Sequence, residues 1–180
     1  MKKICVCLFI VGVLSALPAR AELQWREGRW QLELAGSTGV DSGGEKRTGD
    51  YMFKAMLEYE VPFSSHLTLG LRTLPLFVYE QEERGEDTVW GGGVGLGLRL
   101  YSVADECRGW FAEAGAHALG HKHRFAGNSS NINFLTGLGV GYKCKEGWHS
   151  VLRWEHISNA NLGDHNSGVN VLSLGIGYAF

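Results

Sequence analysis

The sequence is poor in three features that define common protein classes. Proline occurs only 3 times in 180 residues and no Gly-X-Y period is present, which excludes collagen and proline-rich linkers. After residue 21 no apolar run reaches the roughly 18 residues of a transmembrane helix, so no such helix is expected. No basic stretch follows that point either, and a nucleic-acid partner is therefore not expected.

Glycine is abundant instead. The chain contains 26 glycines, about twice the usual share of roughly 7%. Hydrophobic residues make up 44% and charged residues 20% of the sequence, which argues against a disordered chain and against a coiled coil. Glycine at this frequency within hydrophobic alternation predicts strands that pack at close quarters. The length suits one domain.

The first 21 residues have the pattern of an export signal. Lys2 and Lys3 precede an apolar run, and an Ala-Arg-Ala sequence ends the segment at Ala21. We therefore expect a signal peptide at residues 1–21 and a single mature domain at residues 22–180. Loss of three basic residues changes the formal net charge from −2 to −5. Cys107 and Cys144 then lie in an oxidising compartment, where they either pair or remain free thiols.

The mature chain alternates between apolar and polar or small residues almost throughout. Such alternation predicts strands with one apolar face, and many of the segments are longer than the five or six residues typical of soluble strands. The connections alternate between short turns and longer polar loops, which is the pattern of an outer-membrane barrel. The eight predicted strands cover residues 28–38, 50–60, 65–78, 88–101, 109–119, 131–142, 148–158 and 168–180.

The two faces of these strands differ in a way that predicts which side meets lipid. One face carries large apolar side chains, and the other carries glycines and charges that can pair with one another. The charged set comprises Glu33, Lys54, Glu58, Arg72, Arg99, Glu113, His117, Arg153 and Glu155. A lumen of paired charges beneath an apolar exterior predicts an all-β, eight-stranded antiparallel transmembrane β-barrel of the outer membrane, too narrow for a wide channel. Pro75, within the third strand, predicts a bulge.

Three polar residues break the apolar face of the last two strands. Parity sends His156, Ser158 and Asn170 toward the membrane, where polar side chains are costly unless they have a partner or a function. Counting from Trp148, His156 lies roughly 19 Å up the membrane normal, close to one interface. Symmetric closure of loop 159–167 places His156 opposite Asn170 and Ser158 opposite Gly168. The cluster matches a nucleophile, base and orienting group, although polar residues near a strand end can also be purely interfacial.

The local sequence resembles the PagL family of lipid A 3-O-deacylases. The residues that carry the resemblance are His156-Ile157-Ser158-Asn159-Ala160, Asn166, Gly168 and the final Gly177-Tyr178-Ala179-Phe180. The resemblance implies an outer-membrane serine esterase without a cofactor that removes the 3-position acyl chain of lipid A. Its active site is then expected to face the outer leaflet, with lipopolysaccharide as its partner.

The same resemblance assigns roles to individual residues. It implies His156 as the base and Ser158 as the nucleophile, with Asn159 supporting the site or the oxyanion and Asn166 as a donor to the oxyanion. Where the best-known members have a Glu, this chain has Asn170, which can orient His156 but cannot stabilise an imidazolium by charge. Asp164 in the adjacent loop is another candidate for the acidic role. Glu155 is not, because parity directs it into the lumen.

Other interpretations remain open from the sequence. The main rival is a non-catalytic small barrel, an adhesin or a structural OmpX-like protein, and a third reading is a soluble periplasmic barrel that carries a lipid in its lumen. A homodimer is compatible with the sequence. The histidines His117, His121 and His123 can bind a metal only with further ligands, and we expect none there. The charge run at 82–87 is expected to be a solvated loop.

Overall fold

The alternation of the sequence corresponds to the two faces of one closed sheet. The structure is a computed structural model that describes residues 23–42, 46–81 and 88–180. The expected signal peptide at 1–21 and the charge run at 82–87 lie outside the described residues. Within the described residues, no helix is both long and apolar enough to cross a membrane.

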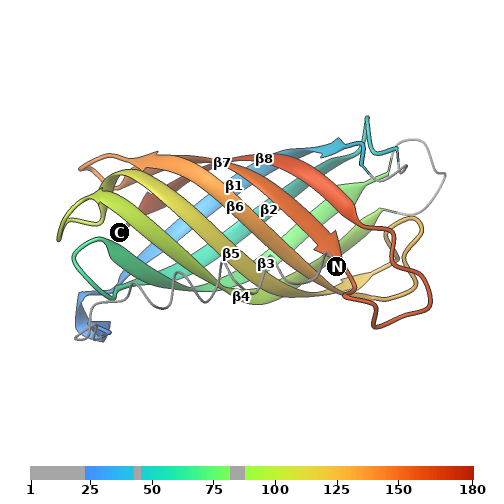
Figure 1. Ribbon diagram of the computed structural model, residues 1–180, viewed down its shortest axis with the longest axis horizontal. Coiled ribbons are helices and arrows are strands. Elements are labelled where there is room, and N and C mark those ends of the chain that lie inside the picture. The colour runs from blue at the N-terminus through green and yellow to red at the C-terminus, as the bar shows by residue number, and fades with distance from the viewer. Residues whose placement is uncertain (1–22, 43–45, 82–87) are drawn as a thin grey trace, which may run out of the picture.

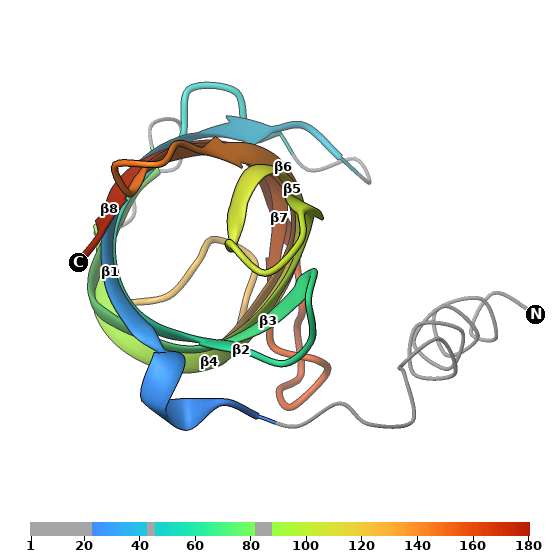
Figure 2. The same ribbon diagram turned by 90° about the vertical axis from the view of Figure 1, so that its left-hand side faces the viewer.

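Eight antiparallel strands follow one another around the barrel, and the last pairs with the first to close it (Figures 1 and 2). The fold class and all eight predicted strands are confirmed, with ends that differ by a few residues. A short 3-10 helix, η1 (Trp25–Glu27), precedes β1 (Arg29–Val40), β2 (Tyr51–Pro62), β3 (Leu67–Glu80), β4 (Val89–Val103), β5 (Arg108–Lys122), β6 (Ile132–Lys143), β7 (Trp148–Ser158) and β8 (Val169–Ala179).

The connections at the two ends of the barrel differ in length, as the sequence predicts. The turns at 63–66, 104–107 and 144–147 lie at the same end as η1 and the C-terminus, on the left in Figure 1. The longer connections at the opposite end join β1 to β2, β3 to β4, β5 to β6 and β7 to β8. In outer-membrane barrels the long loops face the cell exterior.

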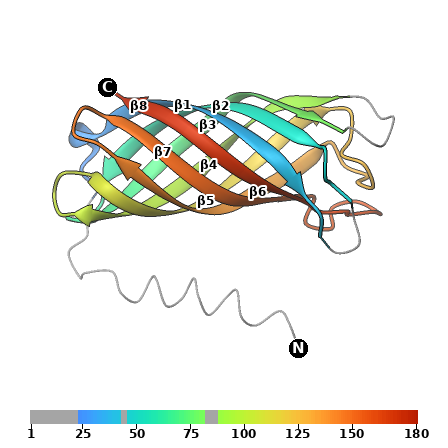
Figure 3. The same ribbon diagram turned by 90° about the horizontal axis from the view of Figure 1, so that it is seen from above.

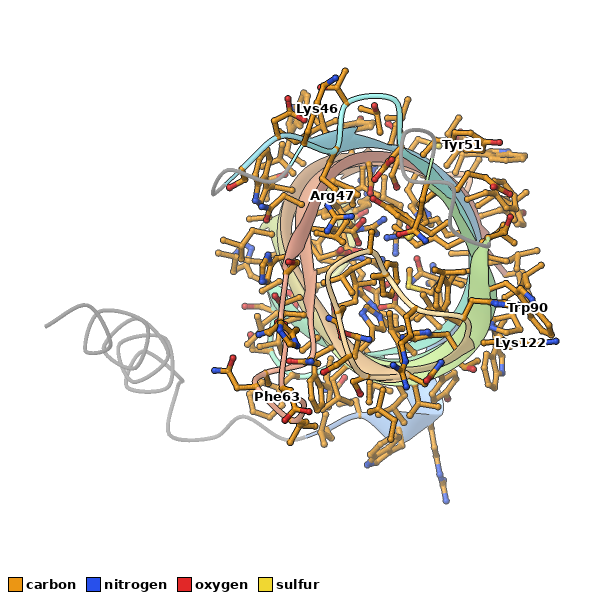
Figure 4. The ribbon with its side chains drawn as sticks, turned by 90° about the vertical axis from the view of Figure 1, so that its right-hand side faces the viewer. Lys46, Arg47, Tyr51, Phe63, Trp90 and Lys122 are labelled. Atoms are coloured by element: carbon orange, nitrogen blue, oxygen red, sulfur yellow. The ribbon has the colours of Figure 1, made fainter. Side chains whose placement is uncertain are left out.

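The outward face is a continuous apolar surface. Large apolar side chains are exposed on every strand, from Leu34 on β1 to Ile176 on β8, at 50% and 56% respectively. At the short-turn end, aromatic side chains pair across neighbouring strands: Trp30 with Tyr59, Trp110 with Tyr142, and Trp148 with Tyr178. At the other rim, Tyr51 and Trp90 stand on the outside (Figure 4). This is the girdle arrangement of a barrel that spans a membrane.

The lumen is filled by ion pairs, so the charged residues point inward as predicted. The Glu113 carboxylate receives hydrogen bonds from Arg72 (2.7 Å), Arg99 (2.7 Å) and Arg153 (2.6 Å). Glycine makes room for these side chains, because a Cβ on Gly115 would lie 2.7 Å from Arg72 Nη1. A soluble barrel that carries a lipid needs the opposite distribution, with apolar residues along the lumen and charges outside. The alternative interpretation of this chain as a soluble periplasmic barrel is therefore wrong.

The long-loop end of the lumen is apolar, which the sequence analysis did not predict. A cluster of buried side chains fills it beneath the loops: Met52, Leu74, Phe77, Tyr79, Val89, Leu119, Phe125, Leu135, Ile157, Val169 and Val171. Phe125 comes from the loop between β5 and β6, residues 123–131, which runs across the barrel mouth in Figure 4. The ionic lumen is therefore closed at this end by a hydrophobic layer.

The bulge predicted at Pro75 is present in β3. The register against β4 shifts between Leu74 and Phe77, which pair with Gly93 and Gly91. Both Leu74 and Phe77 are buried, whereas Pro75 between them is exposed. The extra residue lets proline, which has no backbone N–H to donate, stay outside the ladder.

Candidate functional site

The last hairpin brings two of the three predicted polar residues into direct register. His156 on β7 pairs with Asn170 on β8, as predicted, and Figure 3 shows β8 lying between β7 and β1. Both side chains are half-buried, while their strand neighbours Ile157 and Val169 are buried in the lumen. Because successive side chains of a strand point to opposite faces, His156 and Asn170 lie on the lipid-facing side.

A hydrogen bond joins these two side chains. His156 Nδ1 lies 2.8 Å from Asn170 Oδ1. An amide oxygen can only accept, so Nδ1 carries the proton and Nε2 of the neutral ring has the free electron pair. Asn170 therefore fixes both the orientation and the tautomer of the imidazole. It does so without a charge.

Ser158 is the last residue of β7, two positions after His156 on the same face, and it is also half-buried. Among the described residues, no hydrogen bond joins Ser158 to His156; such contacts often tighten only when substrate binds. The ladder ends at Ile157 and Val169, so the predicted pairing of Ser158 with Gly168 is absent. Gly168 instead lies against the His156 ring, where a Cβ would be 2.5 Å from Cε1.

Asn159 is fully buried, and its polar groups are used within the protein. Its backbone N–H donates to Asn166 Oδ1 (2.9 Å), and its Nδ2 donates to Asn128 Oδ1 (3.1 Å) and to the His165 carbonyl (2.9 Å). Its Oδ1 accepts from the Asn161 N–H (2.9 Å). Of the two roles that the resemblance allowed for Asn159, this geometry favours support of the site over donation to an oxyanion.

Asn166 is half-buried and holds the turn that follows β7. Its Oδ1 accepts from the Asn159 backbone, and its Nδ2 donates to Asn161 Oδ1 (3.1 Å). The turn needs this support because Ala160 and Asn161 both have positive φ, 52° and 64°. One of the two Nδ2 hydrogens of Asn166 has no further bond among the described residues, so it can still donate to a ligand.

The two acidic residues near the site lie apart from His156. Asp164 is exposed in the loop, and its carboxylate has no ion pair or hydrogen bond within the described part of the chain. Glu155 points into the lumen, as predicted, and pairs there with Lys54 and Ser173. Asn170 is thus the side chain that contacts His156.

The histidines and cysteines set aside in the sequence lie elsewhere. His117 is buried in the lumen, as predicted, and His121 Nδ1 lies 2.9 Å from the His123 carbonyl oxygen. The described residues contain no group of three or more His, Cys, Asp or Glu placed to hold a metal ion. Cys107 and Cys144 are free thiols, and burial raises the pKa of the Cys107 thiol.

Sequence reasoning missed the contribution of β6 and the loop before it. Thr136 on β6 pairs with His156, which makes it a further polar neighbour on the lipid-facing side. Asn128 and Asn133 connect Asn159 to the barrel wall. The role of Asn133 could have been predicted from strand alternation. Odd-numbered residues of this strand face inward, and a buried amide needs hydrogen-bond partners.

Two solved structures share the fold. The chain is similar to neisserial surface protein A (NspA), with a TM-score of 0.52, 14% identity, and coverage of 85% of this chain and 97% of that one. It is also similar to the outer membrane protein Ail of Yersinia pestis in a phospholipid bilayer nanodisc, with a TM-score of 0.51, 16% identity, and coverage of 86% and 100%. At this identity the likeness concerns the fold alone. No curated protein matches the sequence.

The family comparison covers most of the chain. The family described as lipid A 3-O-deacylase (PagL) matches residues 19–179, which include the whole barrel and the hairpin with His156, Ser158 and Asn170. The resemblance first carried by a short motif thus extends from β1 to β8. The chain belongs to the lipid A 3-O-deacylase (PagL) family.

Proposed function

We propose that this protein is a serine esterase that hydrolyses the ester of the 3-position acyl chain of lipid A. Ser158 is the nucleophile, His156 the general base and Asn170 the group that orients His156. The observation that carries the proposal is the 2.8 Å hydrogen bond between His156 and Asn170 on the lipid-facing surface of a chain from this family. A polar pair on that surface is costly without a function.

The reaction follows from the tautomer that Asn170 imposes. His156 Nε2 accepts the proton of Ser158 Oγ as the oxygen attacks the ester carbonyl, and a tetrahedral oxyanion forms. When this intermediate collapses, the 3-hydroxyl of lipid A leaves with the proton from His156, and the acyl chain stays on Ser158. Water, activated by the same imidazole, then hydrolyses the acyl-enzyme and releases the fatty acid. No cofactor is required.

The position of the site suits the outer leaflet. Ser158 ends β7 at the long-loop end of the barrel, and long loops face the cell exterior in this class of barrel. Lipopolysaccharide in that leaflet brings its acyl esters to the polar–apolar boundary, beside which the three side chains lie. In this proposal the substrate arrives by lateral diffusion along the apolar wall, and Asn166 uses its remaining N–H to bind the oxyanion.

Lipid A from cells that express wild type or single variants tests the proposal by mass spectrometry. We expect wild type to remove one hydroxyacyl chain and Ser158→Ala to remove none. The matched control is Ser150→Ala, because Ser150 is an exposed serine on the same face of β7, nearer the short-turn end.

Two results would contradict the proposal. Identical spectra with and without the wild-type protein would favour the non-catalytic barrel, an adhesin or structural protein. Activity of Ser158→Ala equal to that of Ser150→Ala would show that another group is the nucleophile. Equal expression and folding of the variants is checked by the shift of the barrel band on unheated gels.

A further inference from the structure

We propose that Asn128, in the loop between β5 and β6, is a positioning residue for the deacylase site. This inference rests on the proposed function and concerns how Ser158 is held. Asn128 belongs neither to β7 nor to β8 and does not touch the three reacting side chains. It acts through Asn159, the residue that directly follows Ser158.

The side chain of Asn128 is buried and bridges two parts of the protein. Its Oδ1 accepts from Asn159 Nδ2 at 3.1 Å and from the Ser130 backbone N–H at 3.0 Å. Its Nδ2 donates to Asn133 Oδ1 at 2.9 Å. A single amide thus connects the loop after β7 with the first residues of β6.

The backbone on either side of Asn128 contacts the same partner loop. Asn128 forms an isolated antiparallel bridge with Asn166. The Ser129 N–H donates to the His165 carbonyl at 3.1 Å, and the Ser167 N–H donates to the Gly127 carbonyl at 2.9 Å. The backbone of residues 127–129 is therefore hydrogen-bonded to residues 165–167, and the Asn128 side chain points from there toward Asn159.

The chain of hydrogen bonds from Asn159 through Asn128 to Asn133 ends in the barrel wall. Asn133 on β6 is fully buried, and its Nδ2 lies 2.7 Å from His121 Nε2 on β5. His121 Nδ1 faces the His123 carbonyl, which can only accept, so Nδ1 is protonated and Nε2 accepts from Asn133. Every link from His121 to Asn159 then has a matched donor and acceptor, which holds Asn159 against two rigid strands.

The consequence for Ser158 is geometric. β7 ends at Ser158 and turns through the left-handed residues Ala160 and Asn161, so little regular structure fixes the direction of its last peptide. The anchored Asn159 side chain supplies that direction. Misplacement of a catalytic group by about 1 Å costs as much as 10²-fold in rate, whereas the apolar wall that binds the acyl chains is unchanged.

The test measures kcat and KM separately with purified protein in detergent micelles and lipopolysaccharide as substrate. We expect Asn128→Ala to lower kcat by about tenfold to a hundredfold while KM stays within about twofold. The control is Asn131→Ala. It removes three side-chain hydrogen bonds, two to the His121 and His123 carbonyls and one from the Arg124 guanidinium, and none to residues 159–168. It should retain wild-type kcat.

A double-mutant cycle shows whether Asn128 acts through Asn159. We expect the double variant of Asn128→Ala and Asn159→Ala to be no slower than Asn159→Ala alone. Losses that multiply would overturn the inference, as would a kcat for Asn128→Ala equal to that of Asn131→Ala. An inactive wild-type protein would instead refute the proposed function.

A second variant, Asn133→Ala, tests the same inference if Asn128→Ala fails to fold. Asn133→Ala leaves the contact between Asn128 and Asn159 in place and removes the anchor behind it. If Asn128→Ala does not give a folded barrel, Asn133→Ala is expected to lower kcat by at least about threefold at unchanged KM and unchanged thermal unfolding. A wild-type kcat in that variant would overturn the inference.

Discussion

Asn170 gives His156 an orienting partner but no counter-charge. The amide oxygen holds the ring at 2.8 Å and selects the tautomer. In the proposed reaction Nε2 takes the proton of Ser158, and no carboxylate among the described residues contacts the resulting imidazolium, since Asp164 is exposed in the loop and Glu155 lies in the lumen. The charge that develops in the transition state is therefore stabilised less than in a triad with an acid.

Asn170→Glu is expected to increase kcat. A carboxylate at this position keeps the hydrogen bond to Nδ1 and adds an attraction to the imidazolium that forms when Nε2 takes up the proton. We expect a gain of about tenfold or more in lipid A deacylation. Asn170→Gln, which has the same length and no charge, is the control. Equal rates for the two variants would show that charge is not limiting.

Gly168 leaves the space that the His156 ring occupies. A Cβ there would lie 2.5 Å from Cε1, so Gly168→Ala must displace the ring. We expect at least about a tenfold loss of kcat with little change in thermal unfolding of the barrel, since residue 168 lies outside the strands. Gly120→Ala is the matched control because a Cβ there meets no atom within 4 Å. An active Gly168→Ala enzyme would place the ring elsewhere during catalysis.

At this scale the sequence predicts orientation better than contact. The pairing of His156 with Asn170 follows from strand parity and a symmetric loop, and both are local properties of the chain. The inward direction of Asn159 and its bond to Asn128 do not follow, because they join residues 31 positions apart through two loops. Loops carry no alternation from which such a contact can be read.

The loop at 123–131 is held in the barrel mouth by an aromatic contact. Phe125 is fully buried, with its ring parallel to that of Phe77 at 6.4 Å and edge-on to Tyr79 at 5.1 Å between centroids. Its neighbour Arg124 is exposed. The hydrophobic layer at this end therefore anchors the same loop that contributes Asn128.

Phe125→Ala is expected to loosen this loop while the barrel persists. Removal of a buried phenyl ring costs about 3–5 kcal/mol, and here the loop can respond by leaving the mouth. Limited proteolysis should then cut within 123–131 at least about tenfold faster than in wild type. Arg124→Ala, at an exposed neighbouring position, should be cut at the wild-type rate. Equal cleavage of both variants would mean that the aromatic contact does not hold the loop.

The strands themselves were predictable because alternation and strand length are both set by a membrane of fixed thickness. The bulge at Pro75 was predictable for a different reason, since proline cannot donate to a ladder. The hydrophobic layer at the long-loop end of the lumen was not predicted, although Leu119, Leu135 and Ile157 all fall on the inward face. Strand alternation shows whether a side chain points into the lumen or toward lipid. It does not show which side chains from other strands and loops pack against it in the lumen.

Beyond the hydrophobic layer at the long-loop end, the interior of the barrel contains a connected network of charges. Glu113 alone contacts three guanidinium groups, from Arg72, Arg99 and Arg153, and Arg99 extends the network to Glu58 and Glu60. All are buried, so each charge depends on its partners in place of water. Removal of one member leaves others uncompensated.

Glu113→Gln is expected to lower the free energy of unfolding by about 3–5 kcal/mol. The loss is measured by urea unfolding of the protein in lipid vesicles, followed by tryptophan fluorescence. Glu106→Gln is the control, because Glu106 pairs with Arg108 at an exposed site where such a pair is worth less than about 1 kcal/mol. Equal stability of the two variants would mean that the lumen is open to water.

The neighbour of Asn170 in the strand on its other side is Val40 of β1, so the proposed catalytic side chains border the seam where the two ends of the sheet meet. β7 and β8 can form a hairpin before β1 pairs with β8. The β1 side of the surface around Asn170 exists only after this pairing has closed the barrel. Enzymatic turnover should therefore begin only once insertion is finished. Release of fatty acid would time the last event of membrane assembly in this protein.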